Sequence, residues 1–373
     1  MEHGDPGVDS GSKATHRRDP RAMRRRTGGP RGAWMKALRK RSTRAGDVGL
    51  DDVQEPRAAP GQALLEVWGA GVCGTDLHIS EGSFASWPPV TMGHEVTGRV
   101  LEVGQGVDSA LVGQHVVSET FYSTCGSCAW CQDGRPNLCP ERRSIGSGAD
   151  GGFARLMVVP AKNLHRLAGA VDPQAAALCE PLACVCQSLC DPSPVQPGDD
   201  VLVSGPGTMG LLSAQVARVA GGHVLITGTE EDTVRLEAAA RLGFATALAR
   251  DRQSVKRLGG GYGPQVVVEC SGAAAAMAAG IDLLRRGGRM VQIGQTDRPV
   301  PVRLAQVSFF ELTITGGFAS TPRSWRRALD LLRARAVQLD PLVSEVAPLD
   351  EWERVFASTA SARGIKYLFD PRL

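Results

Sequence analysis

The chain has 373 residues, of which 42% are hydrophobic and 22% are charged, enough for two domains with ordinary cores. No apolar run of about 18 residues occurs, so the sequence predicts no membrane-spanning segment. The first 34 residues carry eight Lys and Arg against four Asp and Glu, a net charge of +4. Because the whole chain is +3, residues 35–373 carry −1, and their charge gives no reason to expect nucleic-acid binding.

The N-terminal segment, residues 1–34, is rich in Arg, Gly and Pro and has no periodic apolar face. It also lacks the apolar stretch of a secretory signal peptide. We expect a disordered basic leader, with Met35 as the natural start, and we keep a functional basic arm as the alternative.

Ten cysteines are present, and six of them are scattered as single residues: Cys73, Cys179, Cys184, Cys186, Cys190 and Cys270. Disulfide scaffolds belong to small secreted domains that cannot build a core. This chain is long enough to build one, so we expect reduced thiols and a cytoplasmic protein.

Residues 62–66 and 96–103 are apolar runs broken by glycine, which predicts short strands of a compact, loop-rich β domain. The segment "CGTDLH" (73–78) follows the first run, and Gly93-His94-Glu95 precedes the second. A catalytic zinc site needs three protein ligands and one open position.

Cys73 and His94 are suitable zinc ligands, and the third is either Glu95 or Glu180, which lies in "CEPLA" (179–183). Asp76 is expected to receive the second ring N–H of His94 and so to fix the orientation of the imidazole.

The segment "CGSCAWCQDGRPNLC" places Cys125, Cys128, Cys131 and Cys139 within fifteen residues. Bacterial iron–sulfur segments have a shorter last gap, C-x3-C in place of C-x7-C. Four thiolates suit a tetrahedral, closed structural zinc site, which is the interpretation we adopt.

From about residue 199 short apolar strands alternate with helix-length segments, which predicts βαβ units and a doubly wound parallel sheet. Gly205-Pro-Gly207-Thr-Met-Gly210 follows the strand "VLVS" and opens a helix. In that context the three glycines predict a dinucleotide-binding turn whose helix N-terminus receives the phosphates. A helix over 324–336 and a last strand in "GIKYLFDP" (364–371) complete the expected α/β fold.

The second strand ends in "LITGTEED", where an acid is expected to hold the ribose hydroxyls. With Gly228 at the strand end, that role passes to Glu230 or Glu231. No Arg lies within this loop and its three acids would repel a 2′-phosphate, so the sequence favours NAD over NADP.

These residues resemble the zinc-dependent medium-chain alcohol dehydrogenases, and within them the sorbitol (iditol) and threonine dehydrogenase branches. The likeness covers residues 35–373 and depends on Cys-Gly-x-Asp, on "GHExxGxV" over 93–100, on the four-cysteine segment and on the glycine turn. "CEPLA" is similar to those two branches, in which a Glu replaces a cysteine ligand of the alcohol dehydrogenases.

The resemblance implies a catalytic zinc held by Cys73, His94 and Glu95, with Glu180 touching it directly or through water and Cys179 as the rival. It implies that Thr75 and His78 relay the hydroxyl proton and that Lys366 reaches the cofactor pyrophosphate. The strand ends 269–272 and 292–294 are expected to line the nicotinamide. The aromatic side chains expected to line the substrate cleft are Phe121, Tyr122 and Phe318.

The implied layout is a GroES-like catalytic domain over 35–185 with a structural-zinc lobe at 121–141, an NAD-binding Rossmann domain over 186–318, and a return to the catalytic domain over 319–373. The implied function is oxidation of a secondary alcohol of a polyol or sugar alcohol to a ketone. The alternatives are a threonine-like amino alcohol, a vicinal diol, a cyclitol, or a cofactor-binding relative without catalysis. We expect a small-molecule alcohol substrate, two zinc ions per chain, no membrane or nucleic-acid partner, and a homodimer or homotetramer.

Overall fold

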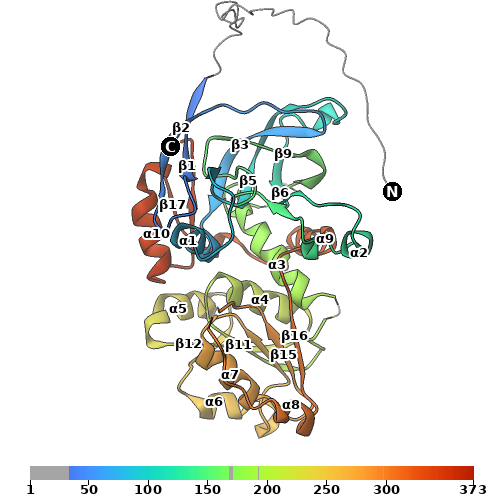
Figure 1. The fold of residues 1–373 in the computed structure, drawn as a ribbon. Helices are drawn as coiled ribbons and strands as arrows, with labels where there is room; N and C mark the ends of the chain where they lie inside the picture. The colour runs from blue at the N-terminus through green and yellow to red at the C-terminus, as the bar shows by residue number, and fades with distance from the viewer. Residues whose placement is uncertain (1–32, 168–170, 192, 297) are drawn as a thin grey trace, which may run out of the picture. The chain divides into compact units, whose positions relative to one another are not determined.

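The structure, a computed structural model, describes residues 33–167, 171–191, 193–296 and 298–373 (Figure 1). Nearly all of the predicted leader therefore lies outside the described residues. Residues 34–373 form one compact unit. Within the described part of the chain, every helix is too short or too polar to cross a bilayer.

The N-terminal half of this unit is built on β-strands, as predicted. Its main sheet has seven strands in the order β10-β6-β5-β3-β18-β17, with β9 also paired to β3. The bounds are β3 Gln62–Gly71, β5 Glu95–Val103, β6 His115–Ser118, β9 Leu156–Pro160, β10 Leu164–Arg166, β17 Val343–Ala347 and β18 Lys366–Phe369. Strands β17 and β18 come from the C-terminal end of the chain, so the predicted last strand joins the first half of the molecule.

Smaller elements surround this sheet. A three-stranded sheet has the order β2-β1-β4, and a separate pair of strands, β7 and β8, flanks the four-cysteine segment. The bounds are β1 Trp34–Lys40, β2 Val48–Gln54, β4 Val90–Thr91, β7 Phe121–Ser123, β8 Arg143–Ser144, α1 Gly74–Glu81, α2 Ala129–Gln132 and α10 Trp352–Ala360. Helix α1 follows β3 directly and so lies at the end of a strand of the main sheet.

The second half contains a six-stranded parallel sheet in the order β13-β12-β11-β14-β15-β16. Its bounds are β11 Asp200–Ser204, β12 His223–Gly228, β13 Ala245–Leu248, β14 Val266–Glu269, β15 Arg289–Gln292 and β16 Thr313–Gly316. The strand order, 3-2-1-4-5-6 in sequence terms, is that of the doubly wound dinucleotide-binding fold. The predicted fold class is confirmed.

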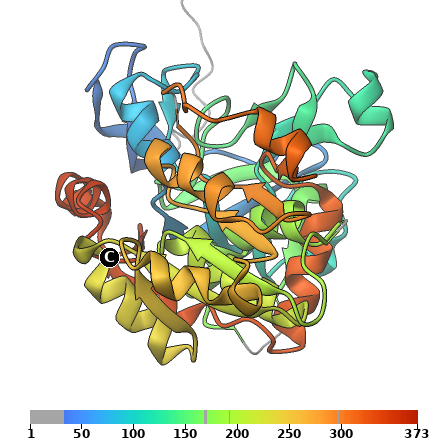
Figure 2. The same ribbon diagram turned by 90° about the horizontal axis from the view of Figure 1, so that it is seen from below.

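Helices lie on both sides of these strands (Figures 1 and 2). The helices around this sheet are α4 Thr208–Val219, α5 Thr233–Arg241, α6 Arg252–Lys256, α7 Ala274–Leu283 and α8 Ala305–Phe309. Two further helices, α3 Cys179–Leu189 and α9 Pro322–Arg333, lie beside the first half (Figure 1). The helix predicted over 324–336 is α9, which begins two residues earlier and ends three residues earlier because Ala334 caps it. Helix α3 packs against both α4 and α9.

The largest apolar cluster joins the two halves. It contains buried residues of α3, α4 and α9 together with Val117 of β6 and Leu368 of β18. Because one core includes side chains from both sheets, the first turn of α3 is held rigidly between them. That turn carries Cys179 and Glu180.

Candidate active site

Cys73 and His94 lie at the ends of neighbouring strands of the main sheet. Cys73 is the N-cap of α1, where its backbone N–H donates to Asp76 Oδ2 at 2.9 Å. His94 immediately precedes β5, and Glu95 is the first residue of that strand. At Gly71, which pairs with Glu95 across the two strands, a Cβ atom would stand 2.0 Å from Glu95 Oε2, so only glycine leaves room for this carboxylate.

The ligand atoms of Cys73, His94 and Glu95 all lie within 4.8 Å of one another. One thiol, one imidazole and one carboxylate form the kind of three-ligand set that a catalytic zinc uses. Asp76 is fully buried, and its Oδ1, which has no hydrogen-bond partner among the described residues, lies 3.6 Å from His94 Nδ1. This orphaned oxygen faces the ring as expected for a carboxylate that orients a metal-bound histidine.

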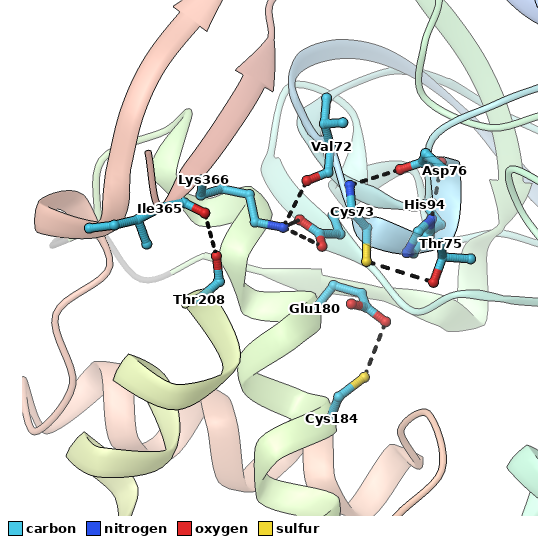
Figure 3. Close-up of polar contacts among 11 residues, drawn as sticks. Val72, Cys73, Thr75, Asp76, His94, Glu180, Cys184, Thr208, Ile365 and Lys366 are labelled. Carbon is cyan, nitrogen blue, oxygen red and sulfur yellow. Dashed lines mark hydrogen bonds and ion pairs between the residues drawn. The ribbon is translucent and has the colours of Figure 1, made fainter. Parts of the chain in front are cut away.

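Glu180 and Cys179 occupy adjacent positions on α3 but face different surroundings. Glu180 lines the same cleft as Cys73 and His94, and Cys184 Sγ donates to its Oε1 over 3.3 Å (Figure 3). Burial raises the pKa of the Glu180 carboxyl, whereas nearby His94 lowers it. Cys179 is fully buried outside the cleft lining, and burial raises the pKa of its thiol to about 12. Of the two, only Glu180 is placed to approach a metal ion beside Cys73.

Lys366 forms a buried ion pair that the sequence did not predict. Its Nζ donates to both carboxylate oxygens of Glu95, at 2.7 and 2.8 Å, and to the Val72 carbonyl at 3.1 Å (Figure 3). Burial by itself lowers the pKa of Lys366, but Glu95, Cys73 and Glu180 together outweigh this effect and the pKa is raised. The ammonium thus faces the carboxylate of the candidate metal-ligand set. The adjacent Ile365 carbonyl accepts a hydrogen bond from Thr208, the first residue of α4, at 2.9 Å.

The two predicted relay residues lie on α1 and line the cleft. Thr75 Oγ1 is 3.7 Å from Cys73 Sγ. The His78 side chain is 61% exposed, and its Nδ1 lies 3.6 Å from Glu81 Oε2. Thr75 is therefore beside the candidate metal-ligand set, and His78 is in contact with solvent.

The four clustered cysteines also converge. The sulfur atoms of Cys125, Cys128, Cys131 and Cys139 lie within 4.8 Å of one another. The Cys128 N–H points at Cys125 Sγ over 3.3 Å, and backbone N–H groups lower the pKa of the Cys125 thiol to about 6. Four converging thiols, one of which readily ionises, suit a closed zinc site.

The glycine turn lies between β11 and α4, as predicted. Gly205 has a φ of +95°, and a Cβ at Gly210 would meet the Gly205 carbonyl at 1.9 Å, so this strand and helix pack closely only with glycine at both positions. Gly207 is the N-cap of α4. Glu230 lies in the loop after β12 and forms an ion pair with Arg250, whose Nε is 2.9 Å from Glu230 Oε1.

A cleft of about 350 Å³ is lined both by the Cys73–His94–Glu95 set and by strand ends of the parallel sheet. The catalytic-domain residues on its walls include Cys73, His94 and Glu95. Five residues from the strand ends expected to line the nicotinamide lie on the walls of this cleft: Cys270, Ser271, Gly272, Ile293 and Gly294. This arrangement brings the candidate metal-ligand set and the strand ends expected to hold a dinucleotide to one space.

The aromatic predictions are only partly correct. Phe318 lines the cleft, but Phe121 and Tyr122 do not. Phe121 is buried, and Tyr122 packs against the core of the main sheet and accepts a hydrogen bond from Gln62 at 2.8 Å. Sequence reasoning also missed Arg142 and Cys184, which line the cleft although no motif marks them.

Comparisons with known proteins agree with this geometry. Residues 59–169 match the model of the alcohol dehydrogenase GroES-like domain, and residues 208–334 match that of the zinc-binding dehydrogenases. The chain is 39% identical to a sorbitol dehydrogenase of Halalkalibacterium halodurans over 90% of this chain and 99% of that protein. It is 30% identical to a D-arabitol-phosphate dehydrogenase of Enterococcus avium over 90% and 97% of the two chains.

Among solved structures, the chain is similar to a zinc-binding dehydrogenase from Sinorhizobium meliloti 1021 bound to NADP. The TM-score is 0.84 and the identity 34%, over 91% of this chain and 100% of that one. Sequence and fold thus agree over nine-tenths of the chain with proteins of one kind. The chain belongs to the zinc-binding alcohol dehydrogenases, a family of oxidoreductases that join a GroES-like domain to a Rossmann domain.

Proposed function

We propose that this enzyme oxidises a secondary alcohol of a polyol or sugar alcohol to a ketone, with zinc and NAD. The observation that carries the proposal is the convergence of Cys73, His94 and Glu95 within 4.8 Å on the wall of a cleft that the dinucleotide-binding strand ends also line. The two curated relatives described above are named for a sugar alcohol and for a sugar-alcohol phosphate, which supports a polyol backbone as substrate.

The donor set and its surroundings fit a catalytic zinc. Cys73, His94 and Glu95 would hold the ion, Asp76 would orient His94, and Glu180 would approach the ion directly or through water. Cys125, Cys128, Cys131 and Cys139 would hold a second, structural zinc with no open position.

When bound, zinc supplies Lewis acidity that makes an alcohol hydroxyl easier to deprotonate, and the nicotinamide supplies a hydride acceptor. Thr75 is proposed to accept the hydroxyl proton, and His78 to exchange it with solvent. Histidine suits this task because its ordinary pKa is about 6.5. The walls of the cleft hold the reacting carbon in place and reduce its contact with water.

Gly205, Gly207 and Gly210 are proposed to admit the cofactor pyrophosphate, and Glu230 to contact the adenosine ribose. The expected pyrophosphate contact of Lys366 requires its ammonium to leave Glu95 when cofactor binds. NADP is the competing cofactor. Arg250 and Arg235 lie outside the acidic loop but form ion pairs with Glu230 and Asp232 within it, so positive charge is also present there.

We also propose the domain layout given by the sequence, with a catalytic domain over 35–185 and 319–373 and a cofactor domain over 186–318. Pairing of β18 with β3 supports the return of the chain. A homodimer or homotetramer and a cytoplasmic location remain part of the proposal.

The test combines zinc content per chain with a screen of polyols, amino alcohols and cyclitols, each with NAD and NADP, followed by absorbance of the reduced cofactor. The proposal predicts two zinc ions and the highest kcat/KM with a polyol and NAD. A preference for threonine or a cyclitol would overturn the substrate class, and a chain with one zinc and no activity would overturn the mechanism.

A further inference from the structure

One cleft residue has no role in the chemistry described above. Arg142 follows the four-cysteine segment by three residues and, among the described residues that line the cleft, is the sole Lys or Arg. Its guanidinium carbon lies 4.9 Å from the ring centre of Phe318 and 6.0 Å from that of Phe121. The side chain thus lies over Phe318, an aromatic ring that also lines the cleft.

The positive charge of Arg142 is not neutralised by an ion pair within the described part of the chain. Burial lowers its pKa, while Cys184, Glu180 and Cys139 raise it. Since an arginine remains charged under all ordinary conditions, the site keeps a partly desolvated cation with free N–H donors. Because Arg142 is half-buried, an anion that pairs with it would form charge-assisted hydrogen bonds that solvent screens only in part.

The surrounding structure fixes this group in place. Asn137, a buried residue of the four-cysteine lobe, donates from Nδ2 to the Phe318 carbonyl at 2.9 Å. The same lobe is followed directly by β8, which starts at Arg143 and pairs with β7. The lobe therefore anchors both Arg142 and the ring against which it stacks.

We infer that Arg142 binds an anionic group, a phosphate or a carboxylate, carried by the substrate. A guanidinium presents paired N–H donors that match either oxyanion in a bidentate manner. Neutral polyols would leave this cation unpaired, whereas a charged substrate would neutralise it. The inference rests on the proposed polyol function and narrows its substrate class.

The experiment measures kcat and KM for three matched substrates: a five-carbon polyol, the same polyol with a terminal phosphate, and the corresponding aldonate with a terminal carboxylate. For the wild-type enzyme we expect kcat/KM for at least one anionic form to exceed that for the neutral polyol by roughly 10- to 100-fold, the range of one charge-assisted hydrogen-bonded pair. The phosphate and aldonate arms show which oxyanion is preferred.

Arg142→Met should reduce this ratio to about 1, chiefly through a higher KM for the anionic substrate, and Arg142→Lys should retain part of it. In the wild type alone, the KM for the anionic substrate should rise with salt, because screening weakens the charge pair. Arg143→Met is the matched control, since Arg143 stacks on Trp87 at 3.7 Å and does not line the cleft, and it should keep the wild-type ratio. Zinc content and melting temperature check that each variant is folded.

The inference is overturned if the neutral polyol is oxidised as well as both anionic forms, or if Arg142→Met and Arg142→Lys keep the wild-type ratio. In those cases the polyol function itself stands. If none of the three substrates is oxidised by a fully metallated wild-type enzyme, the proposed function fails and the inference fails with it.

Discussion

The two candidate metal-ligand sets differ in how many parts of the chain they draw on. The four-cysteine set takes all its ligands from residues 125–139, and three of the four are only partly buried. The cleft set takes its ligands from the ends of two strands and depends on buried partners from elsewhere, Asp76 on α1 and Lys366 on β18. A closed local set suits an ion held for structure, whereas an open set built from distant parts of the fold suits an ion that leaves room for substrate.

This difference predicts that changes in the cleft set act on chemistry and that changes in the lobe act on stability. The largest effect is expected for Cys73→Ser, which removes a thiolate ligand from the open site. Turnover should fall roughly 1,000-fold or more, since several kcal/mol of Lewis-acid assistance are lost. Steady-state assays measure this, while titration should show that cofactor still binds.

Cys190→Ser is a matched control for that substitution, because Cys190 caps the C-terminus of α3 and does not line the cleft. It should keep wild-type turnover. Normal turnover in Cys73→Ser would show that the thiolate does not hold a catalytic ion.

The second largest effect is expected for Lys366→Met, which removes the buried ammonium paired with the Glu95 carboxylate. Loss of one partner of a buried pair should lower the free energy of unfolding by about 3 kcal/mol. Denaturant titration measures this difference. Lys36→Met removes an exposed pair with Asp52 and should cost roughly 0–1 kcal/mol.

The pH dependence of this loss follows from the raised pKa of Lys366. A group whose pKa is raised by folding stabilises the protein fully at any pH below its unfolded pKa, which is about 10.4 for lysine. The stabilisation is lost as the pH rises through the pKa of the folded state. The difference between wild type and Lys366→Met should therefore stay constant from pH 6 to pH 9. A difference that disappears by pH 9 would mean that the ammonium is not stabilised by Glu95.

A smaller effect is expected for Asp76→Asn, which keeps the shape of the side chain but removes the charge facing His94. Changes of such supporting carboxylates typically cost about 10- to 100-fold in metal affinity or activity. Competition with a chelator measures the affinity of the cleft zinc. Asp108→Asn, at an exposed N-cap, should leave that affinity unchanged.

The smallest effect on chemistry is expected for Cys128→Ser, in the lobe. The kcat of the folded enzyme should stay close to that of the wild type, whereas the melting temperature should drop by several degrees because a structural zinc contributes folding free energy. Calorimetry and zinc analysis check both points. An unchanged melting temperature with lost turnover would place the lobe in the chemistry.

The same contrast explains what could be predicted from the sequence. The lobe was readable from spacing alone, and so was the glycine turn, because their groups are neighbours in the chain. The parallel sheet followed from the alternation of strands and helices, and the last strand from its apolar run, whereas its return to the first half was implied by the family resemblance. The pairing of Lys366 with Glu95 and the approach of Arg250 to Glu230 were not predicted, because they join residues about 270 and 20 positions apart through tertiary packing. Arg142 was missed for the same reason: its place in the cleft is set by Phe318, 176 residues later.

The most direct test of the central claim is the zinc content of the purified wild type and of Cys73→Ser, measured per folded chain. The claim is that the cleft set binds an ion of its own, distinct from that of the four-cysteine lobe. We expect two zinc ions in the wild type and one in the variant. One ion in both proteins, or two in both, would contradict the account.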